Sequence, residues 1–306
     1  WLCPKYHLSV KQCAVLATLK PYTTFLVCCA VAAALGVSFG TEYNWLVAGC
    51  CLVILVAGLP HGAFDLYILA DLFKGRSFFW AIVGYLALII LTVLLWWLAP
   101  QLFLIGFLSY SAFHFGDSDW PADSVVNRLG WGSAIVTLPC LLAPDQVTAL
   151  FTIVLNTPSM PLITDVLGFI AILATLSSCI EFASRKINTC TLILLSFYST
   201  VCFFAGAIVA FTCYFAFLHG PHHLQRWRLK LPNKGNLQIY LVSFGVLATI
   251  LLLGVFTVNG EHTQTKDLAN AIDATVVRYT FVALAALTVP HMVYLFVADH
   301  LSHKEI

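Results

Sequence analysis

Long apolar runs separated by short polar connectors make up most of this chain. The runs cover residues 23–39, 45–72, 78–99, 101–115, 129–143, 162–183, 189–218, 237–258 and 276–298. A helix needs about 20 apolar residues to cross the hydrocarbon core of a bilayer, and most of the runs approach or exceed that length. The pattern predicts an all-α fold, a polytopic transmembrane helical bundle with eight to ten membrane helices.

The connectors between these runs are too short to separate domains. Residues 74–76 and 184–186 are examples, and the longest polar connector covers residues 259–273. Domain boundaries usually lie in longer flexible linkers. We therefore expect residues 1–306 to form a single integral-membrane domain.

The composition excludes several classes of protein. Hydrophobic residues make up 60% of the chain and charged residues 9%, and the mean hydropathy is +0.92, whereas soluble domains carry about 25% charged residues. A nucleic-acid partner is excluded because it would require a basic surface. Eleven cysteines are present, but most lie in or beside apolar runs and none forms a CxxC pair. We expect neither a disulfide framework nor a thiolate metal site.

The basic residues predict an orientation in the membrane. They gather at residues 5–20, 74–76, 185–186 and 226–234, and cytoplasmic loops are enriched in Lys and Arg. We expect a multi-pass protein of the cell membrane, the inner membrane of a prokaryote, with a cytoplasmic N-terminus. If 189–218 is one crossing, the basic connectors at 185–186 and 226–234 lie on opposite sides of the membrane, although both are expected in the cytoplasm. Either this run is bent or re-entrant, or one of the two connectors is an exception to the enrichment of cytoplasmic loops in Lys and Arg. The topology of residues 189–236 stays open.

Histidines in apolar surroundings are the main chemical signal. Ionisable groups in membrane helices are costly and usually face the interior of the bundle, and imidazole is the commonest nitrogen ligand of metals. One such histidine alone is often only a hydrogen-bonding partner. Several on separate helices favour a shared metal site, and the residues in question are His61, His114, His219, His222, His223 and His291.

Prolines accompany three of these positions, namely Pro60, Pro221 and Pro290. Proline kinks or restarts a helix, so these histidines are expected to point into a cavity. His219 and His223 are four residues apart and share a face if the helix continues. If a new helix starts at Pro221, His222 can take the ligand role instead; we favour His223.

The donor set and its neighbours narrow the chemistry. An all-nitrogen site suits iron, copper or zinc. Asp65 and Asp117 follow His61 and His114 closely, and a metal-bound histidine usually donates its second N–H to a carboxylate, carbonyl or water. These two aspartates are candidates for that support, although both are equally compatible with helix ends at the interface. Aromatic residues, 14% of the chain, suit a long apolar substrate, or simple packing.

Four motifs together resemble the Brp/Blh family of β-carotene 15,15′-dioxygenases. They are GLPHGAFD at 58–65, SAFHFGDSD at 111–119, HGPHH at 219–223 and PH at 290–291. The resemblance implies cleavage of the central double bond of β-carotene by O₂ into two molecules of retinal, at a non-haem Fe²⁺. A retinal-binding rhodopsin is the expected downstream recipient.

The resemblance also implies roles for individual residues. The iron ligands fall on His61, His114, His219 and His223. His222 departs from the pattern of the third motif and is a candidate pocket or supporting residue. His291 also matches, as a ligand or a pocket residue.

Two other classes of protein remain alternatives. Residues 219–223 fit the HxxHH box of membrane di-iron desaturases and hydroxylases, which need several such boxes because they bind two metals. A transporter with buried histidines as a relay is the third reading. We find one box and no clear inverted repeat in the sequence.

Overall fold

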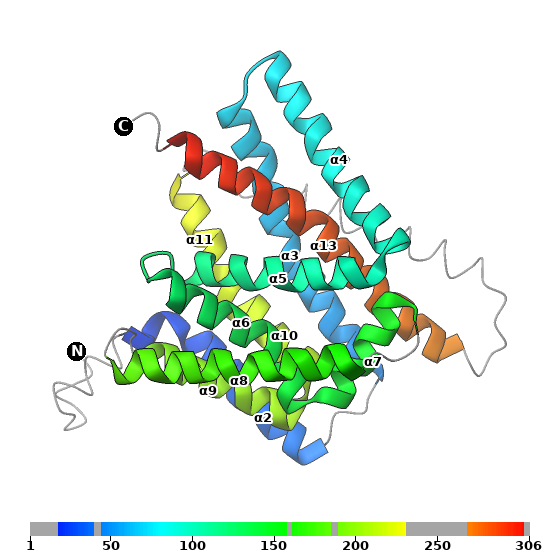
Figure 1. Cartoon of the computed structure of the whole chain (residues 1–306), viewed down its shortest axis with the longest axis vertical. Coiled ribbons are helices and arrows are strands. Elements are labelled where there is room, and N and C mark those ends of the chain that lie inside the picture. The colour runs from blue at the N-terminus through cyan, green and yellow to red at the C-terminus, as the bar shows by residue number, and fades with distance from the viewer. Residues whose placement is uncertain (1–17, 40–43, 158–160, 185–188, 231–267, 303–306) are drawn as a thin grey trace. The chain divides into compact units, whose positions relative to one another are not determined.

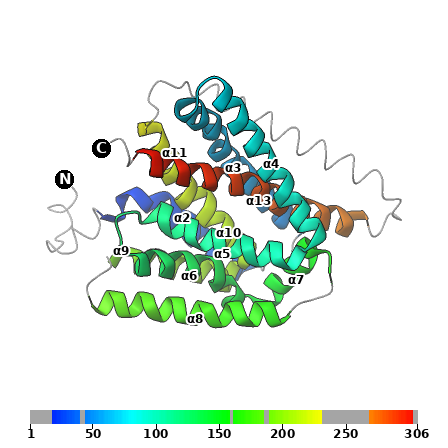
Figure 2. The same ribbon diagram turned by 45° about the horizontal axis from the view of Figure 1, so that its top comes forward.

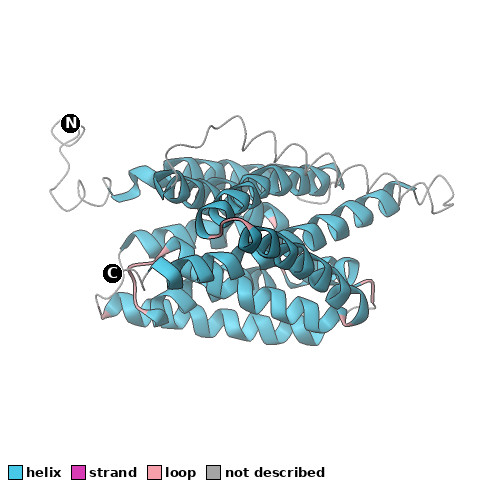
Figure 3. Cartoon of the chain, turned by 90° about the horizontal axis from the view of Figure 1, so that it is seen from above, coloured by secondary structure: helices cyan, strands magenta, loops and turns pink. Residues whose placement is uncertain are grey.

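The computed structural model describes residues 18–39, 44–157, 161–184, 189–230 and 268–302. Within these residues every regular element is a helix and no strand occurs (Figure 3). The all-α prediction is therefore confirmed. The elements are η2 (Lys20–Tyr22), α2 (Thr23–Phe39), α3 (Asn44–Leu72), α4 (Arg76–Leu98), α5 (Pro100–Asp119), α6 (Val125–Leu142), α7 (Pro144–Leu155), α8 (Pro161–Ala183), α9 (Thr189–Ala205), α10 (Ala207–Tyr214), the π-helix η3 (Phe215–His219), α11 (Gly220–Lys230) and α13 (Leu268–Ser302).

Five of the described helices are long and apolar enough to cross a membrane. They are Lys20–Phe39, Arg76–Leu98, Val125–Leu142, Pro161–Ala183 and Ala274–Val297. Large apolar side chains stand exposed along α4, Ile90 and Trp97 among them, as lipid-facing surfaces require. The chain is a polytopic helical membrane protein. The number of eight to ten crossings stays a prediction, and the expected run 237–258 lies outside the described residues.

The long apolar run 189–218 is bent. Its first helix, α9, ends at Ala205, and Gly206 adopts a φ of 90° before α10 begins. Glycine adopts positive φ without the steric cost that other residues meet. The side chain of Gln146 accepts a hydrogen bond from the N–H of Ala207 at 3.1 Å, which satisfies one of the free donors at the start of α10. The bend was one of the explanations left open by the sequence.

The described residues fall into two compact units. Unit 1 comprises the described parts of 1–42, 111–147 and 161–219, and unit 2 those of 43–110, 148–160 and 220–306. The division cuts α5 between Tyr110 and Ser111. The single domain expected over residues 1–306 stays a prediction.

In unit 1 the helices approach one another closely through small residues. Helix α8 lies along α6 (Figure 1), and the end of α5 crosses α6 at Gly132, where a Cβ would collide with the backbone of Ala112. Close backbone approach at small residues is characteristic of membrane helix packing. The phenol of Tyr198 donates to the carbonyl of Ile135 at 2.8 Å and ties α9 to α6. This packing fixes the end of α5, which carries His114.

In unit 2 helix α13 packs against both α3 and α4 (Figure 2). The phenol of Tyr294 on α13 donates to the carbonyl of Ala81 on α4 at 2.8 Å. Arg278, also on α13, donates to the carbonyl of Ile153 and to the side chain of Asn156, each at 2.8 Å. These bonds hold α13, and with it His291, in a fixed position in unit 2.

Candidate functional site

Unit 1 brings His114 and His219 together. His114 comes from α5 and His219 is the last residue of the π-helix η3. Their rings meet edge to face, with centroids 5.2 Å apart. His219 is 1% exposed, while His114 is partly buried. Two imidazoles from separate helices therefore lie side by side in the interior of this unit.

Asp119 orients the ring of His219. Its Oδ1 lies 2.9 Å from Nδ1 of His219, and its Oδ2 accepts hydrogen bonds from the phenol of Tyr214 at 2.7 Å and the indole N–H of Trp131 at 2.9 Å. An ionised carboxylate can only accept, so Nδ1 of His219 carries the proton. Nε2 then carries the lone pair that would bind a metal, and a carboxylate at the other ring nitrogen is the arrangement usually found behind metal-bound histidines.

The π-helix that ends at His219 has a cause in the sequence. Pro221 has no N–H, so it cannot donate to the carbonyl of Phe217, four residues earlier. The turn before it widens into η3, and α11 then begins at Gly220. Single π-turns inside α-helices occur frequently at functional sites.

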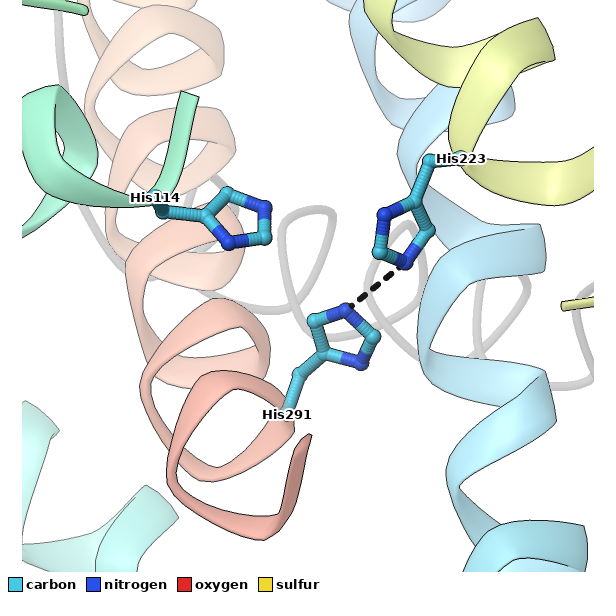
Figure 4. Close-up of side chains that lie close together, drawn as sticks. All are labelled: His114, His223 and His291. Carbon is cyan, nitrogen blue, oxygen red and sulfur yellow. Dashed lines mark hydrogen bonds between the residues drawn. The ribbon is translucent and has the colours of Figure 1, made fainter. Parts of the chain in front are cut away.

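Unit 2 brings His223 and His291 together. Their Nε2 atoms are 3.1 Å apart, and the two rings point toward each other (Figure 4). The ring centroids lie 5.0 Å apart, and both side chains are buried. His223 comes from α11 and His291 from the middle of α13, directly after Pro290.

Asp65 orients the ring of His291 as Asp119 orients that of His219. Its Oδ1 lies 2.5 Å from Nδ1 of His291, and its Oδ2 accepts a hydrogen bond from the phenol of Tyr85 at 2.8 Å. Asp65 is 2% exposed. Each unit thus contains a histidine, a buried aspartate and a tyrosine connected in series.

The other residues singled out in the sequence occupy different surroundings. The backbone of His61 belongs to α3, but its side chain lies outside the described part of the chain. His222 is partly exposed. Asp117, expected beside a metal-bound histidine, pairs instead with the guanidinium of Arg128, and its side chain is 45% exposed. Asp65 meets His291, which is 226 residues away in sequence, at its Oδ1.

Three polar residues that orient the histidines are not apparent from the sequence alone. Asp119 belongs to the second motif, but the spacing from His114 favoured Asp117. Tyr85 and Tyr214 stand in apolar runs among many other aromatic residues. Their hydrogen bonds connect positions 20 and 95 residues apart, and no local pattern announces such pairs. One feature of the sequence could have indicated Asp119: a carboxylate near the end of an apolar helix is costly to bury and therefore needs hydrogen-bonding partners.

The donor atoms fit a transition metal. Nδ1 of His219 and Nδ1 of His291 each face a buried carboxylate, and neutral imidazole nitrogens suit iron, copper or zinc. Phe115 and Phe215 pack on His219, with ring centroids 4.9 and 5.8 Å away. Such an apolar shell limits the access of water to the nitrogens.

The comparisons with known proteins identify the family of the chain. The chain matches the model of a family described as Beta-carotene 15,15'-dioxygenase over residues 52–297. A relative from Uncultured marine bacterium 66A03, named Beta-carotene 15,15'-dioxygenase, is 29% identical over 269 residues, which cover 81% of this chain and 92% of the relative. No solved structure matches the chain. The matched segment includes His61 and both histidine pairs, and the resemblance seen in the motifs is confirmed.

Proposed function

Because the chain belongs to the family of beta-carotene 15,15'-dioxygenases, we propose that it cleaves the central double bond of β-carotene with O₂. The observation that carries this proposal is the family match over residues 52–297, a segment that contains the buried imidazoles with their aspartate partners. The products are two molecules of all-trans-retinal. Both oxygen atoms of O₂ are accounted for by the two aldehydes, so the reaction needs no external reductant.

The proposed cofactor is a single Fe²⁺ bound by imidazoles. The ligands that the family pattern implies are His61, His114, His219 and His223. When bound, the iron supplies the activation of O₂ that the protein's own side chains cannot provide. His219 fits the ligand role because Asp119 faces its Nδ1, so the lone pair is on Nε2, the nitrogen that would bind the iron.

The remaining residues are proposed to position the substrate and exclude water. β-Carotene is a long hydrocarbon that partitions into the bilayer, so it reaches the protein from the lipid. Phe115 and Phe215 give the neighbourhood of His219 apolar walls on which a polyene can pack. No general base is assigned, because the reaction as balanced transfers no proton.

The location and partners follow from the same proposal. The basic connectors support a cytoplasmic N-terminus, and the proposed location is the inner membrane of a prokaryotic cell. Retinal released into the bilayer would be taken up by a retinal-binding rhodopsin. Membrane lipid itself is the solvent for both substrate and product.

Purified protein in detergent or lipid nanodiscs, loaded with Fe²⁺ and supplied with β-carotene and O₂, tests the proposal. We expect retinal as the only aldehyde product and a loss of product after iron is chelated. Shorter or longer apocarotenals would indicate cleavage at another double bond. Two irons per chain with hydroxylated or desaturated products would favour a di-iron enzyme instead. Metal flux across sealed vesicles without any cleavage would favour a transporter.

A further inference from the structure

We propose that His291 is itself a ligand of the iron, and that Asp65 and Tyr85 hold its ring in the ligating tautomer. The inference rests on the proposed function for the identity of the metal. It adds a fifth histidine to the four that the family pattern implies. All of the residues that carry it belong to unit 2.

The separation of the two imidazole nitrogens in unit 2 matches two neighbouring ligands of one ion. The Nε2 atoms of His223 and His291 lie 3.1 Å apart. Two nitrogens bound at about 2.1 Å and at right angles lie about 3.0 Å apart, whereas tetrahedral ligands lie about 3.4 Å apart. Both side chains are buried, so their separation is set by packing inside the unit. In the absence of a cation this separation is that of a hydrogen bond between the two nitrogens, and a cation bound by both would take the place of the shared proton.

The tautomer of His291 is fixed by its other nitrogen. Nδ1 faces Oδ1 of Asp65, and Oδ2 of the same carboxylate already accepts the phenol proton of Tyr85. Because the carboxylate is an acceptor at both oxygens, Nδ1 carries the ring proton and Nε2 presents a lone pair. That lone pair is the one directed at His223.

The same series of groups surrounds His219, which the family pattern implies as a ligand. There Asp119 meets Nδ1, and Tyr214 donates to the far oxygen of the carboxylate. Orienting carboxylates of this kind usually stand behind metal-bound histidines. The repetition of the arrangement around His291 indicates that it has the same task.

Charge supports the same conclusion. Asp65 is 2% exposed, and among the described residues the side chains that contact its oxygens are His291 and Tyr85 rather than a lysine or arginine. Burying an ionised carboxylate away from a permanent positive charge is costly. A divalent cation on the far nitrogen of His291 would supply the missing positive charge through the ring.

The experiment measures metal binding directly in the full-length protein. His291→Ala, Asp65→Asn and Tyr85→Phe are purified with three matched controls, Met292→Ala, Asp71→Asn and Tyr279→Phe. Met292 is buried next to His291, Asp71 is an exposed carboxylate on the same helix as Asp65, and Tyr279 is a partly buried tyrosine on the same helix as His291. The readouts are iron per chain after competition with a chelator and the visible absorption of the Co²⁺-loaded protein, which reports the number of ligands.

For His291→Ala we expect metal affinity to fall more than about 100-fold, beyond the range for a lost supporting residue, together with a changed Co²⁺ spectrum. Added imidazole should restore the spectrum, because it can enter the space left by the side chain. Asp65→Asn should weaken metal binding about 10–100-fold, with a smaller change in the Co²⁺ spectrum. Tyr85→Phe should weaken metal binding less than Asp65→Asn does. The controls should bind as the wild type does.

A His291→Ala protein that elutes as the wild type does and keeps both iron affinity and the Co²⁺ spectrum would overturn the inference. If His291→Ala does not fold, Asp65→Asn decides, since unchanged affinity in that variant also overturns it. The proposed function fails separately, when wild-type protein binds iron but releases no retinal from β-carotene. Wild-type protein that binds no iron overturns both.

Discussion

The Nδ1 atom of His219 lies 2.9 Å from Oδ1 of Asp119, although the two residues are 100 positions apart in the chain. Both side chains are almost completely buried, at 1% and 2% exposure. A carboxylate at this depth is stable only because three groups, the imidazole, a phenol and an indole, donate to it. The histidine is thereby oriented before any ligand arrives.

Asp119→Asn tests this relationship. An amide can offer its N–H to Nδ1 as readily as its oxygen, so the ring of His219 loses its fixed tautomer. We expect metal affinity to fall about 10–100-fold in chelator competition. Asp117→Asn is the comparison, because its carboxylate pairs with Arg128 and should matter less. A larger loss in Asp117→Asn than in Asp119→Asn would instead support the role for Asp117 that the sequence spacing indicated.

Iron content tests the ligand set. We expect one iron per chain, and we expect His61→Ala, His114→Ala and His219→Ala each to lose iron and retinal formation while the protein remains folded in detergent. The physical reason is that the metal would lose one of its nitrogen donors. Elemental analysis with size-exclusion chromatography measures both properties. Full iron and full turnover in any one variant removes that residue from the ligand set.

The fold class could be predicted from the sequence because bilayer crossings have a simple signature. The runs at 78–99 and 162–183 became α4 (Arg76–Leu98) and α8 (Pro161–Ala183) nearly residue for residue. Helix α7 (Pro144–Leu155) was not expected, because it has only 12 residues and no long apolar run. The bend at Gly206 was one of several options, and only the tertiary contact with Gln146 decides it.

The site could be predicted in part, for a different reason. An ionisable side chain in an apolar helix is costly in free energy and is therefore rarely without a function. His114, His219, His223 and His291 could be selected from the sequence for this reason. Their partners were not, because hydrogen bonds such as that between Tyr214 and Asp119 join residues from different motifs. Spacing along one helix pointed to Asp117, whereas packing turned that side chain toward Arg128.

Gly132→Ala tests whether close packing of α5 on α6 holds the histidine pair of unit 1. An added Cβ would meet the carbonyl group of Ala112 and the amide nitrogen of Gly116, backbone atoms that cannot swing aside. We expect a loss of about 1–3 kcal/mol in the free energy of unfolding, measured by thermal denaturation in detergent, with weaker iron binding.

Gly106→Ala is the matched control for this change. It lies on α5 with nothing within 4 Å of the added Cβ. Because alanine loses less backbone entropy than glycine when the helix forms, Gly106→Ala should leave the free energy of unfolding unchanged or raise it by up to about 1 kcal/mol. Equal melting temperatures for Gly132→Ala and wild type would contradict the role assigned to this crossing.

The pair His222 and His223 gives the last prediction. Pro221 lies in the first turn of α11, which begins at Gly220, where a missing N–H is tolerated. His223 is 4% exposed and its Nε2 faces His291, whereas His222 is partly exposed. We therefore expect His223→Ala to lose iron and His222→Ala to keep most of it. The measurement is iron per chain in the two single variants, with retinal formation recorded in parallel. Iron lost from His222→Ala but kept in His223→Ala would reverse the assignment, because the ligand would then have to lie on the other face of α11.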